Sequence, residues 1–400
     1  MNDLPIFDAQ QSGSDYVARA RALAPMIAAA APEIEAQREL TPQVVSALHQ
    51  AGLFRLFVPR WLDGGEAPLS TYVQVIEAIA RGDASTAWCL SQMNVCAISA
   101  MYLNPEAARE VLGKPGSALA WGSSSDCKAV RVPGGYRVSG TWDFGSGCHH
   151  ATWLGAHCPV VGADGDPLKD EKGQPAERTL LVPKSAATVV DVWDVLGLRG
   201  TGSDRYVLND VFVPDQFTIT TLTRWPDAER LKQGIPYRFT ASSLYASGFG
   251  SVALGNARGM LDSFIELATK KVARWTRNSL ADNALVQAGV AEAYTKLESA
   301  RIFMVQNLRE VEETLLTQEA PTIHQRVRIR AAGTSAIRTA TAVANHLYEM
   351  AGTTSIFADN LFQRRFRDAH TVSQHLQGRA SHFENIGKHL LGKDVELRFI

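Results

Sequence analysis

A glycine-rich turn that leads into an alternating strand is the feature that most limits how this chain can fold. The segment Leu196–Pro214 reads LGLRGTGSDRYVLNDVFVP, with apolar residues at Val207, Val211 and Val213. An earlier segment, Gly134–Trp153, reads GGYRVSGTWDFGSGCHHATW and has the same mixture of glycine turns and short apolar runs. Alternating runs of this kind, separated by glycine, predict short β-strands rather than helices.

The residues on either side of these segments have the period of helices, so the chain divides into three parts. Residues 1–115 are predicted to form an N-terminal helical domain, residues 116–235 a middle β domain, and residues 236–400 a C-terminal helical bundle. Regular spacing of short strands in the middle part favours a β-sandwich or a small barrel. The expected fold class is therefore α+β.

Helix boundaries can be placed from capping residues in the first part, where a helix capped by Ser14 or Asp15 is expected to run through Ala31. Thr41 followed by Pro42 is typical of a capped helix start, and that helix is expected to end at Gly52. A later segment, Thr86–Tyr102, is capped by Asp83 or Ser85 in this interpretation. It is so apolar that it must be buried on most sides.

The last part contains long apolar stripes with a helical period. Three long helices and a fourth segment are predicted, over Ser242–Arg277, Asp282–Leu316, Pro321–Met350 and Phe362–Leu391. Long helices joined by short connections predict an antiparallel four-helix bundle.

The composition excludes several classes of partner. Hydrophobic residues make up 46% of the 400 residues and charged residues 20%, with a net charge of −1. Proteins that bind nucleic acid or an anionic membrane have basic surfaces, so neither partner is expected. The apolar runs are too short to span a bilayer, and the N-terminus does not resemble a signal peptide. Five cysteines without a C-x-x-C pair indicate reduced thiols, a cytoplasmic location and no metal site.

Together, the two glycine-rich segments resemble the middle, flavin-binding domain of the acyl-CoA dehydrogenase superfamily. The helix–strand–helix order is also that of the superfamily, so the resemblance covers nearly the whole chain. It implies that Phe144 covers one face of a flavin ring and that Ser146 donates a hydrogen bond near flavin N5, with Gly145 between them. A strand end followed by a glycine turn is the alternative interpretation of the same residues.

Two further stretches are implied to bind the flavin. Trp121, Gly122 and Ser123 take the place of a dehydrogenase segment whose backbone N–H groups and hydroxyls bind the pyrimidine or a phosphate. A polar loop is the alternative there. Arg274 matches an arginine that reaches the flavin diphosphate across a subunit boundary, and a solvated arginine at a helix end is the alternative.

The C-terminal segment carries the second strong pattern, Arg-Asp-Ala-His-x-x-Ser-x-His, which resembles the two-component flavin-dependent monooxygenases of the superfamily. Arg367 and Asp368 are implied to belong to the cofactor site. His375 is implied to face the active site, where an imidazole can orient the substrate or transfer a proton. Asp368 and His375 are seven residues apart, which predicts that they share one helix face.

Asp359 and the buried helix offer further candidates. Asp359 is interpreted either as a carboxylate base, of the kind that nitroalkane oxidases of the superfamily use, or as the cap of the following helix. From the apolar helix, Trp88, Gln92 and Asn94 are candidate substrate contacts, with core packing as the alternative.

The resemblance therefore implies a monooxygenase that hydroxylates a small, phenol- or indole-like aromatic substrate through a C4a-(hydro)peroxyflavin formed from O₂. Its cofactor would be reduced FAD or FMN, FADH2 rather than FMNH2. The chain has no G-x-G-x-x-G fingerprint, so a separate NAD(P)H:flavin reductase is expected to supply the reduced flavin. An acyl-CoA dehydrogenase or nitroalkane-oxidase-like enzyme with Asp359 as base is the alternative. A homotetramer is expected, because members of the superfamily pair their bundles.

Overall fold

The N-terminal part of the computed structural model is helical. The structure describes residues 9–171, 173–220, 234–272, 277–397 and 400. The longer helices of this part are α1 (Ala9–Gln37), α2 (Pro42–Gln50), α3 (Leu69–Gly82), α4 (Ala84–Ala97) and α5 (Pro105–Leu112). Thr41 caps α2 as predicted, since its side chain accepts a hydrogen bond from the Val44 backbone.

Two predicted boundaries in this part need correction. The first helix extends well beyond the expected end at Ala31 and contains Pro25 and Pro32. Burial of Ile27 and Ile34 against the core outweighs the hydrogen bonds that the two prolines cannot donate. The buried helix α4 ends at Ala97 and continues only as a short 3-10 turn, Ile98–Met101.

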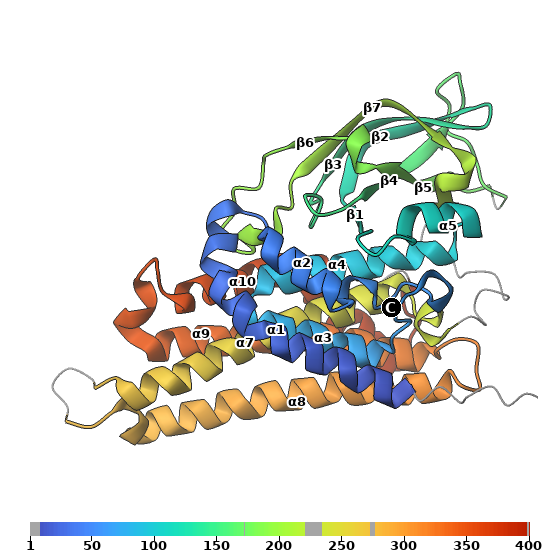
Figure 1. Cartoon of the computed structure of the whole chain (residues 1–400). Coiled ribbons are helices and arrows are strands. Elements are labelled where there is room, and N and C mark those ends of the chain that lie inside the picture. Colours follow the sequence, from blue (N-terminus) through green and yellow to red (C-terminus); the bar gives the residue numbers. More distant parts are fainter. Residues whose placement is uncertain (1–8, 172, 221–233, 273–276, 398–399) are drawn as a thin grey trace, which may run out of the picture.

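The cap and the burial of α4 follow the sequence. Asp83 is the cap, because its side chain accepts from the Thr86 backbone N–H. Every residue of α4 is buried, as its composition predicts. The helix lies between the β domain and the long C-terminal helices (Figure 1).

The middle part forms a sheet over this helical layer (Figure 1). Its strands are β1 (Leu119–Trp121), β2 (Ser123–Val132), β3 (Gly135–Asp143), β4 (Trp153–Val161), β5 (Glu177–Pro183), β6 (Thr188–Val190), β7 (Arg205–Pro214) and β8 (Thr218–Thr220). Within the described residues their order is β6-β7-β3-β2-β4-β5-β8, with β1 paired to β4. One half of the sheet contains β6, β7, β3 and β2, and the other contains β4, β5 and β8. The halves join through a short parallel pairing of β2 with β4, at Ala129–Val160 and Val130–Val161. The segment Leu196–Pro214 forms a turn and then β7, and β7 pairs with β3 from the earlier glycine-rich segment.

The C-terminal part contains α7 (Ala241–Lys270), α8 (Ala284–Thr314), α9 (Ile323–Ala351), α10 (Leu361–Gln374) and α11 (Ser381–Leu390). The three long helices are those predicted, although α7 ends at Lys270 rather than Arg277. After α7, Val272 and Ser279 form an isolated antiparallel bridge. The fourth predicted segment is two shorter helices, α10 and α11, because an extended backbone at His375 breaks it.

One hydrophobic core connects the three parts. It includes Val75 from α3, Leu154 from the sheet and Phe264 from α7, all fully buried. The domain boundaries near residues 115 and 235 stay predictions. In the described part of the chain, no helix is both long and apolar enough to cross a membrane.

Candidate active site

The Ser146 hydroxyl lies at the centre of a buried hydrogen-bond network. The indole N–H of Trp88 donates to Ser146 Oγ over 3.1 Å, and Ser203 Oγ lies 2.6 Å from the same oxygen. Thr201 Oγ1 is in turn 2.7 Å from Ser203 Oγ. Trp88 comes from α4, Ser146 from the first glycine-rich segment and Ser203 from the second. These hydrogen bonds therefore connect α4 with both glycine-rich segments, which are far apart in the sequence.

Backbone hydrogen bonds hold the two glycine-rich turns together. Gly145 N donates to Asp204 O over 3.1 Å, and Gly147 N donates to Thr201 O over 3.2 Å. Gly147 has a φ of +79°, which favours glycine. A Cβ at Gly145 would come within 2.9 Å of Asp204 O. The glycines thus let the two turns approach closely enough for Ser146 to reach Ser203.

Aromatic rings pack against this network. The Trp88 ring stacks on Phe249 of α7, with centroids 3.8 Å apart and planes 9° from parallel. The His375 ring meets both edge-on, at 5.2 Å from Trp88 and 4.7 Å from Phe249. The structure therefore brings three of the predicted site residues, Trp88, Ser146 and His375, into one cluster. We call these residues, with Ser203 and Phe249, the Ser146 cluster.

The stacked rings of Trp88 and Phe249 form an aromatic surface that continues toward β1. Tyr245 lies one turn before Phe249 on α7, with ring centroids 5.6 Å apart. Its hydroxyl accepts a 3.0 Å hydrogen bond from the indole N–H of Trp121 in β1. The Gln92 amide donates to the Trp121 carbonyl over 3.3 Å. Trp121 and Gln92 thus lie at the far end of the same surface as Trp88.

Burial keeps the His375 imidazole neutral. Desolvation, aided by the positive charges of Arg379 and Arg330, lowers the pKa of His375 to about 4. Its Nδ1 accepts from Gln377 N over 3.3 Å. The prediction that His375 shares a helix face with Asp368 is wrong, because α10 ends at Gln374 and His375 is extended, with φ −65° and ψ 150°. The ring reaches the cluster from the residue after the helix.

Arg367 and Asp368 hold the second glycine-rich turn. Asp368 is buried, and its carboxylate accepts a 2.7 Å hydrogen bond from Leu198 N. Arg367 donates to Leu196 O and forms an ion pair with Glu35 of α1. Burial raises the pKa of Asp368 to about 7. Both side chains are thus bonded to the protein itself, and their place in a cofactor site stays a prediction.

The remaining candidates for flavin binding lie on the β domain, at or next to the ends of strands β1, β2 and β3. Phe144 has a φ of +59°, and its side chain is 63% exposed although it is aromatic. Gly122 N donates to the Tyr206 hydroxyl over 3.0 Å. Ser123 is exposed and pairs with Asp143 beside Phe144. An uncovered ring near a hydroxyl-bearing turn fits a bound flat ring system.

Two predicted residues, Asn94 and Asp359, lie apart from the cluster. Asn94 donates to Leu53 O and Leu90 O, so both amide N–H groups are used by the protein backbone. Asp359 is exposed on the connection before α10. Its interpretation as a helix cap is wrong, because Asn360 caps α10 by accepting from Phe362 N. Arg274 lies outside the described residues.

Three residues of this site were not predicted from the sequence, namely Ser203, Tyr245 and Phe249. A signal for the two aromatics exists, since they are four residues apart in a helix start rich in glycine and serine. Gly248 shows why the first turns of α7 need small residues. A Cβ there would lie 2.3 Å from the Tyr72 hydroxyl, so α7 packs very closely on α3.

The donors of the Ser146 cluster are uncharged, which suits a flavin. Hydroxyls, an indole N–H and a neutral imidazole can bond the edge of a ring system on which electron density changes. The exposed Phe144 can cover a face of such a ring. The residues present therefore fit a flavin ring at this place.

Two family models match most of the helical parts of the chain. One, described as acyl-CoA dehydrogenase, N-terminal domain, matches residues 16–114. The other, described as acyl-CoA dehydrogenase, C-terminal domain, matches residues 247–379.

Individual relatives are similar along nearly their whole length. An indole-3-acetate monooxygenase from Pseudomonas putida is 28% identical over 369 residues, 90% of each chain. The flavin-dependent monooxygenase oxygenase subunit HsaA from Rhodococcus jostii is 29% identical over 364 residues, covering 89% of this chain and 93% of HsaA. The structure of XiaF from Streptomyces sp., a complex with FADH2 and glycerol, superposes with a TM-score of 0.89 at 26% identity and covers 97% of each chain. The chain belongs to the acyl-CoA dehydrogenase superfamily, in the branch formed by the oxygenase components of flavin-dependent monooxygenases.

Proposed function

We propose that this protein is the oxygenase component of a two-component system and hydroxylates a small, uncharged aromatic substrate. The observation that carries the proposal is the Ser146 cluster. It places a hydroxyl network on the β domain directly against an aromatic surface and a neutral imidazole. Two relatives, one named as an indole-3-acetate monooxygenase and one as the oxygenase subunit of a flavin-dependent monooxygenase, support the oxygenase part of this assignment.

The residues of the site divide into two roles. Ser146 would bond the flavin near N5, and Phe144 with Gly145 would lie along the ring. Trp121, Gly122 and Ser123 would bind farther along the cofactor, and Arg274 and Arg367 are the cationic candidates for its phosphates. When bound, reduced flavin would supply the two electrons that activate O₂. One oxygen atom enters the aromatic product and the other leaves as water, so the overall reaction balances.

The aromatic surface determines the kind of substrate. Trp88, Phe249 and Tyr245 can stack on an aromatic ring, and the Gln92 amide can bond a polar substituent. These four side chains are uncharged, so they offer no partner for the phosphates of coenzyme A. A neutral phenol or indole is therefore a better fit than a coenzyme A thioester. His375, neutral above a pKa of about 4, would orient the substrate or accept its proton.

The partners follow from the same assignment. A separate NAD(P)H:flavin reductase would supply FADH2 or FMNH2, of which FADH2 is favoured by the XiaF complex. We also propose a homotetramer, supported by exposed apolar side chains along α8, which lies at the outer edge of the molecule in Figure 1. Leu285 is 82% exposed and Ile302 58%, which is unusual for large apolar residues on one helix. Free cysteines support a reducing, cytoplasmic location.

The test is oxygen incorporation. The protein is mixed with anaerobically reduced FAD or FMN, then with ¹⁸O₂ and a panel of phenols and indoles, and the products are analysed by mass spectrometry. One ¹⁸O atom per product molecule is expected. The Ser146→Ala variant should form less product for each flavin oxidised. Ser139→Ala, which removes a hydroxyl that bonds Asp210 N instead, is the matched control.

Two results would contradict the assignment. One is flavin oxidation that yields only H₂O₂ with every aromatic substrate tested. The other is reduction of the oxidised flavin by an acyl-CoA or a nitroalkane, which would restore the alternative with Asp359 as base.

A further inference from the structure

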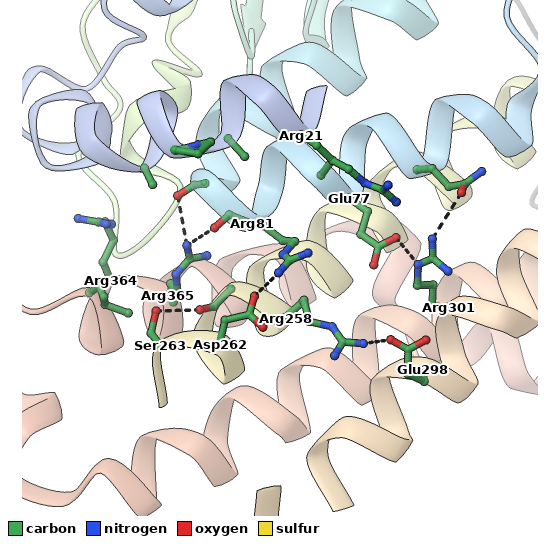
Figure 2. A pocket seen from close by; sticks show the side chains of 18 residues that line it. Arg21, Glu77, Arg81, Arg258, Asp262, Ser263, Glu298, Arg301, Arg364 and Arg365 are labelled. Atoms are coloured by element: carbon green, nitrogen blue, oxygen red, sulfur yellow. Dashed lines mark hydrogen bonds and ion pairs between the residues drawn. The ribbon is translucent and has the colours of Figure 1, made fainter. Parts of the chain in front are cut away.

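A cavity lies between the N-terminal helices and the C-terminal helices, apart from the Ser146 cluster. It has a volume of about 820 Å³ and is lined by residues of α1, α3, α7, α8 and α10. Cavities of this size are typical of small-molecule sites. Figure 2 shows that its side chains are mainly arginines and carboxylates. No member of the Ser146 cluster lines it.

Half of the arginines in this cavity have a carboxylate partner. Six arginines and three carboxylates line it. Each carboxylate pairs with one arginine, and Figure 2 shows the three pairs: Arg81 with Asp262, Arg258 with Glu298, and Arg301 with Glu77. The cavity therefore holds three positive charges more than its own carboxylates balance.

Three arginines account for the excess, namely Arg21, Arg364 and Arg365. Arg21 is exposed on α1, and within the described residues it forms no ion pair. Arg364 lies at one edge of the cavity, with Arg21 toward the other end (Figure 2). Asp83 and Asp368 do not line the cavity, but they interact electrostatically with Arg364 and Arg365 and offset part of the charge of these two arginines.

Arg365 is an unusual residue for the wall of a cavity. It is only 6% exposed, and its guanidinium donates to the backbone carbonyls of Arg81 and Gly82 rather than to a carboxylate. Its Nε has no hydrogen-bond partner among the described residues. Gly259 makes room for it, since a Cβ there would lie 2.7 Å from Arg365 Cζ. Burial, together with the charge of Arg364, lowers the pKa of Arg365 to about 10.

We propose that this cavity binds a small aliphatic oxyanion that carries two or more negative charges. Arg21 and Arg81 would contact the anion, and Arg365 would contribute its buried positive charge. Exposed ion pairs such as Arg81–Asp262 contribute little free energy, so Arg81 can exchange its partner for the ligand at small cost. Guanidinium groups bind phosphate and carboxylate oxygens in pairs, which suits either kind of anion.

The walls restrict the ligand further. The lining residues that are not polar are small or aliphatic, such as Ala24, Ala28 and Leu361, and none of the described lining residues is aromatic. A nucleotide base would have no ring to stack on. The ligand is therefore a multivalent phosphate or carboxylate without an aromatic group.

The proposal is tested by calorimetric titration of the full-length protein at low ionic strength, with inorganic pyrophosphate in one arm and citrate in the other. Saturable binding of at least one probe is expected, weakening as salt screens the charges. Arg21→Gln should weaken that binding roughly tenfold, the effect of losing one charge-assisted hydrogen bond. Asp262→Asn should strengthen it, because it removes the carboxylate that competes for Arg81.

The control is Arg137→Gln, which removes the same charge from β3, where Arg137 pairs with Asp210. It should leave the affinity unchanged. Pyrophosphate binding alone would identify a phosphate ligand, and citrate binding alone a carboxylate. The proposal is overturned if neither probe binds, or if Arg21→Gln and Arg137→Gln have the same effect. These measurements use no flavin, so their failure would leave the proposed oxygenase activity untouched.

Discussion

Replacing Asp368 with asparagine should make the stability of the protein less dependent on pH. Asp368 is buried, and its carboxylate accepts the Leu198 backbone N–H over 2.7 Å. Asparagine keeps a carbonyl oxygen that can accept the same hydrogen bond, but it cannot ionise. The substitution therefore separates the hydrogen bond from the cost of burying a charge.

The magnitude follows from the shift in the pKa of Asp368, which burial raises from an ordinary 3.8 to about 7. Because the folded protein holds this proton to a higher pH than the unfolded chain, stability is fully present below pH 3.8 and is lost as pH rises through 7. At about 1.4 kcal/mol for each pKa unit, the wild-type protein should lose about 2–3 kcal/mol from this group between pH ~5 and ~8. Asp368→Asn should lose none of it.

Urea unfolding at a series of pH values, followed by tryptophan fluorescence, measures this difference. Asp359→Asn, the same change at an exposed carboxylate, is the control. Asp368→Ala should destabilise the protein by roughly 1–3 kcal/mol even at low pH, since it leaves the buried Leu198 N–H without an acceptor. A free-energy difference between Asp368→Asn and wild type that stays constant from pH ~5 to ~8 would refute the argument.

Four further predictions concern the site and the assembly. His375→Ala should leave flavin binding largely intact but slow hydroxylation by ~10²–10⁴-fold or divert the reaction to H₂O₂. An unchanged amount of product for each flavin oxidised would contradict a catalytic role for His375. Because the pKa of His375 is lowered to about 4, its protonation should add no step to the rate profile at neutral pH, as stopped-flow rates can show. Asp359→Asn should change neither rate nor melting temperature, because Asp359 is exposed and Asn360 caps α10; a collapse of the rate would identify a base. Light scattering should show a tetramer, and a monomer that binds reduced flavin normally would disprove it.

The local features of the fold could be predicted because each depends on neighbouring residues. Thr41 with Pro42 specifies a helix start, and the largely apolar Thr86–Tyr102 specifies a buried helix. Where prediction failed, a contact distant in sequence decided the outcome. The proline-containing α1 continues to Gln37 because Ile34 is buried. Helix α10 stops at Gln374, where Arg330 and Thr334 of α9 donate hydrogen bonds to Gln377 in the turn that follows.

The site shows the same division. Ser146, Trp88 and His375 were singled out from the sequence because each belongs to a recognisable pattern. Phe249 and Ser203 were not, because what makes them part of the cluster is a stacking contact and a hydrogen bond across the fold. Asp368 was assigned to the cofactor, whereas its bond to Leu198, 170 residues away, could not be inferred from a single sequence.

The burial of α4 along its whole length bears on how the enzyme can be engineered. A helix enclosed on all sides cannot shift to admit a larger substrate without opening the core, so loop insertion or backbone redesign nearby would be a poor strategy. Selectivity would instead be altered by exchanging single side chains at Trp88 and Gln92, and at Phe249 on the facing helix. Libraries restricted to these three positions should yield more folded variants with new substrate ranges than libraries spread over the surrounding loops.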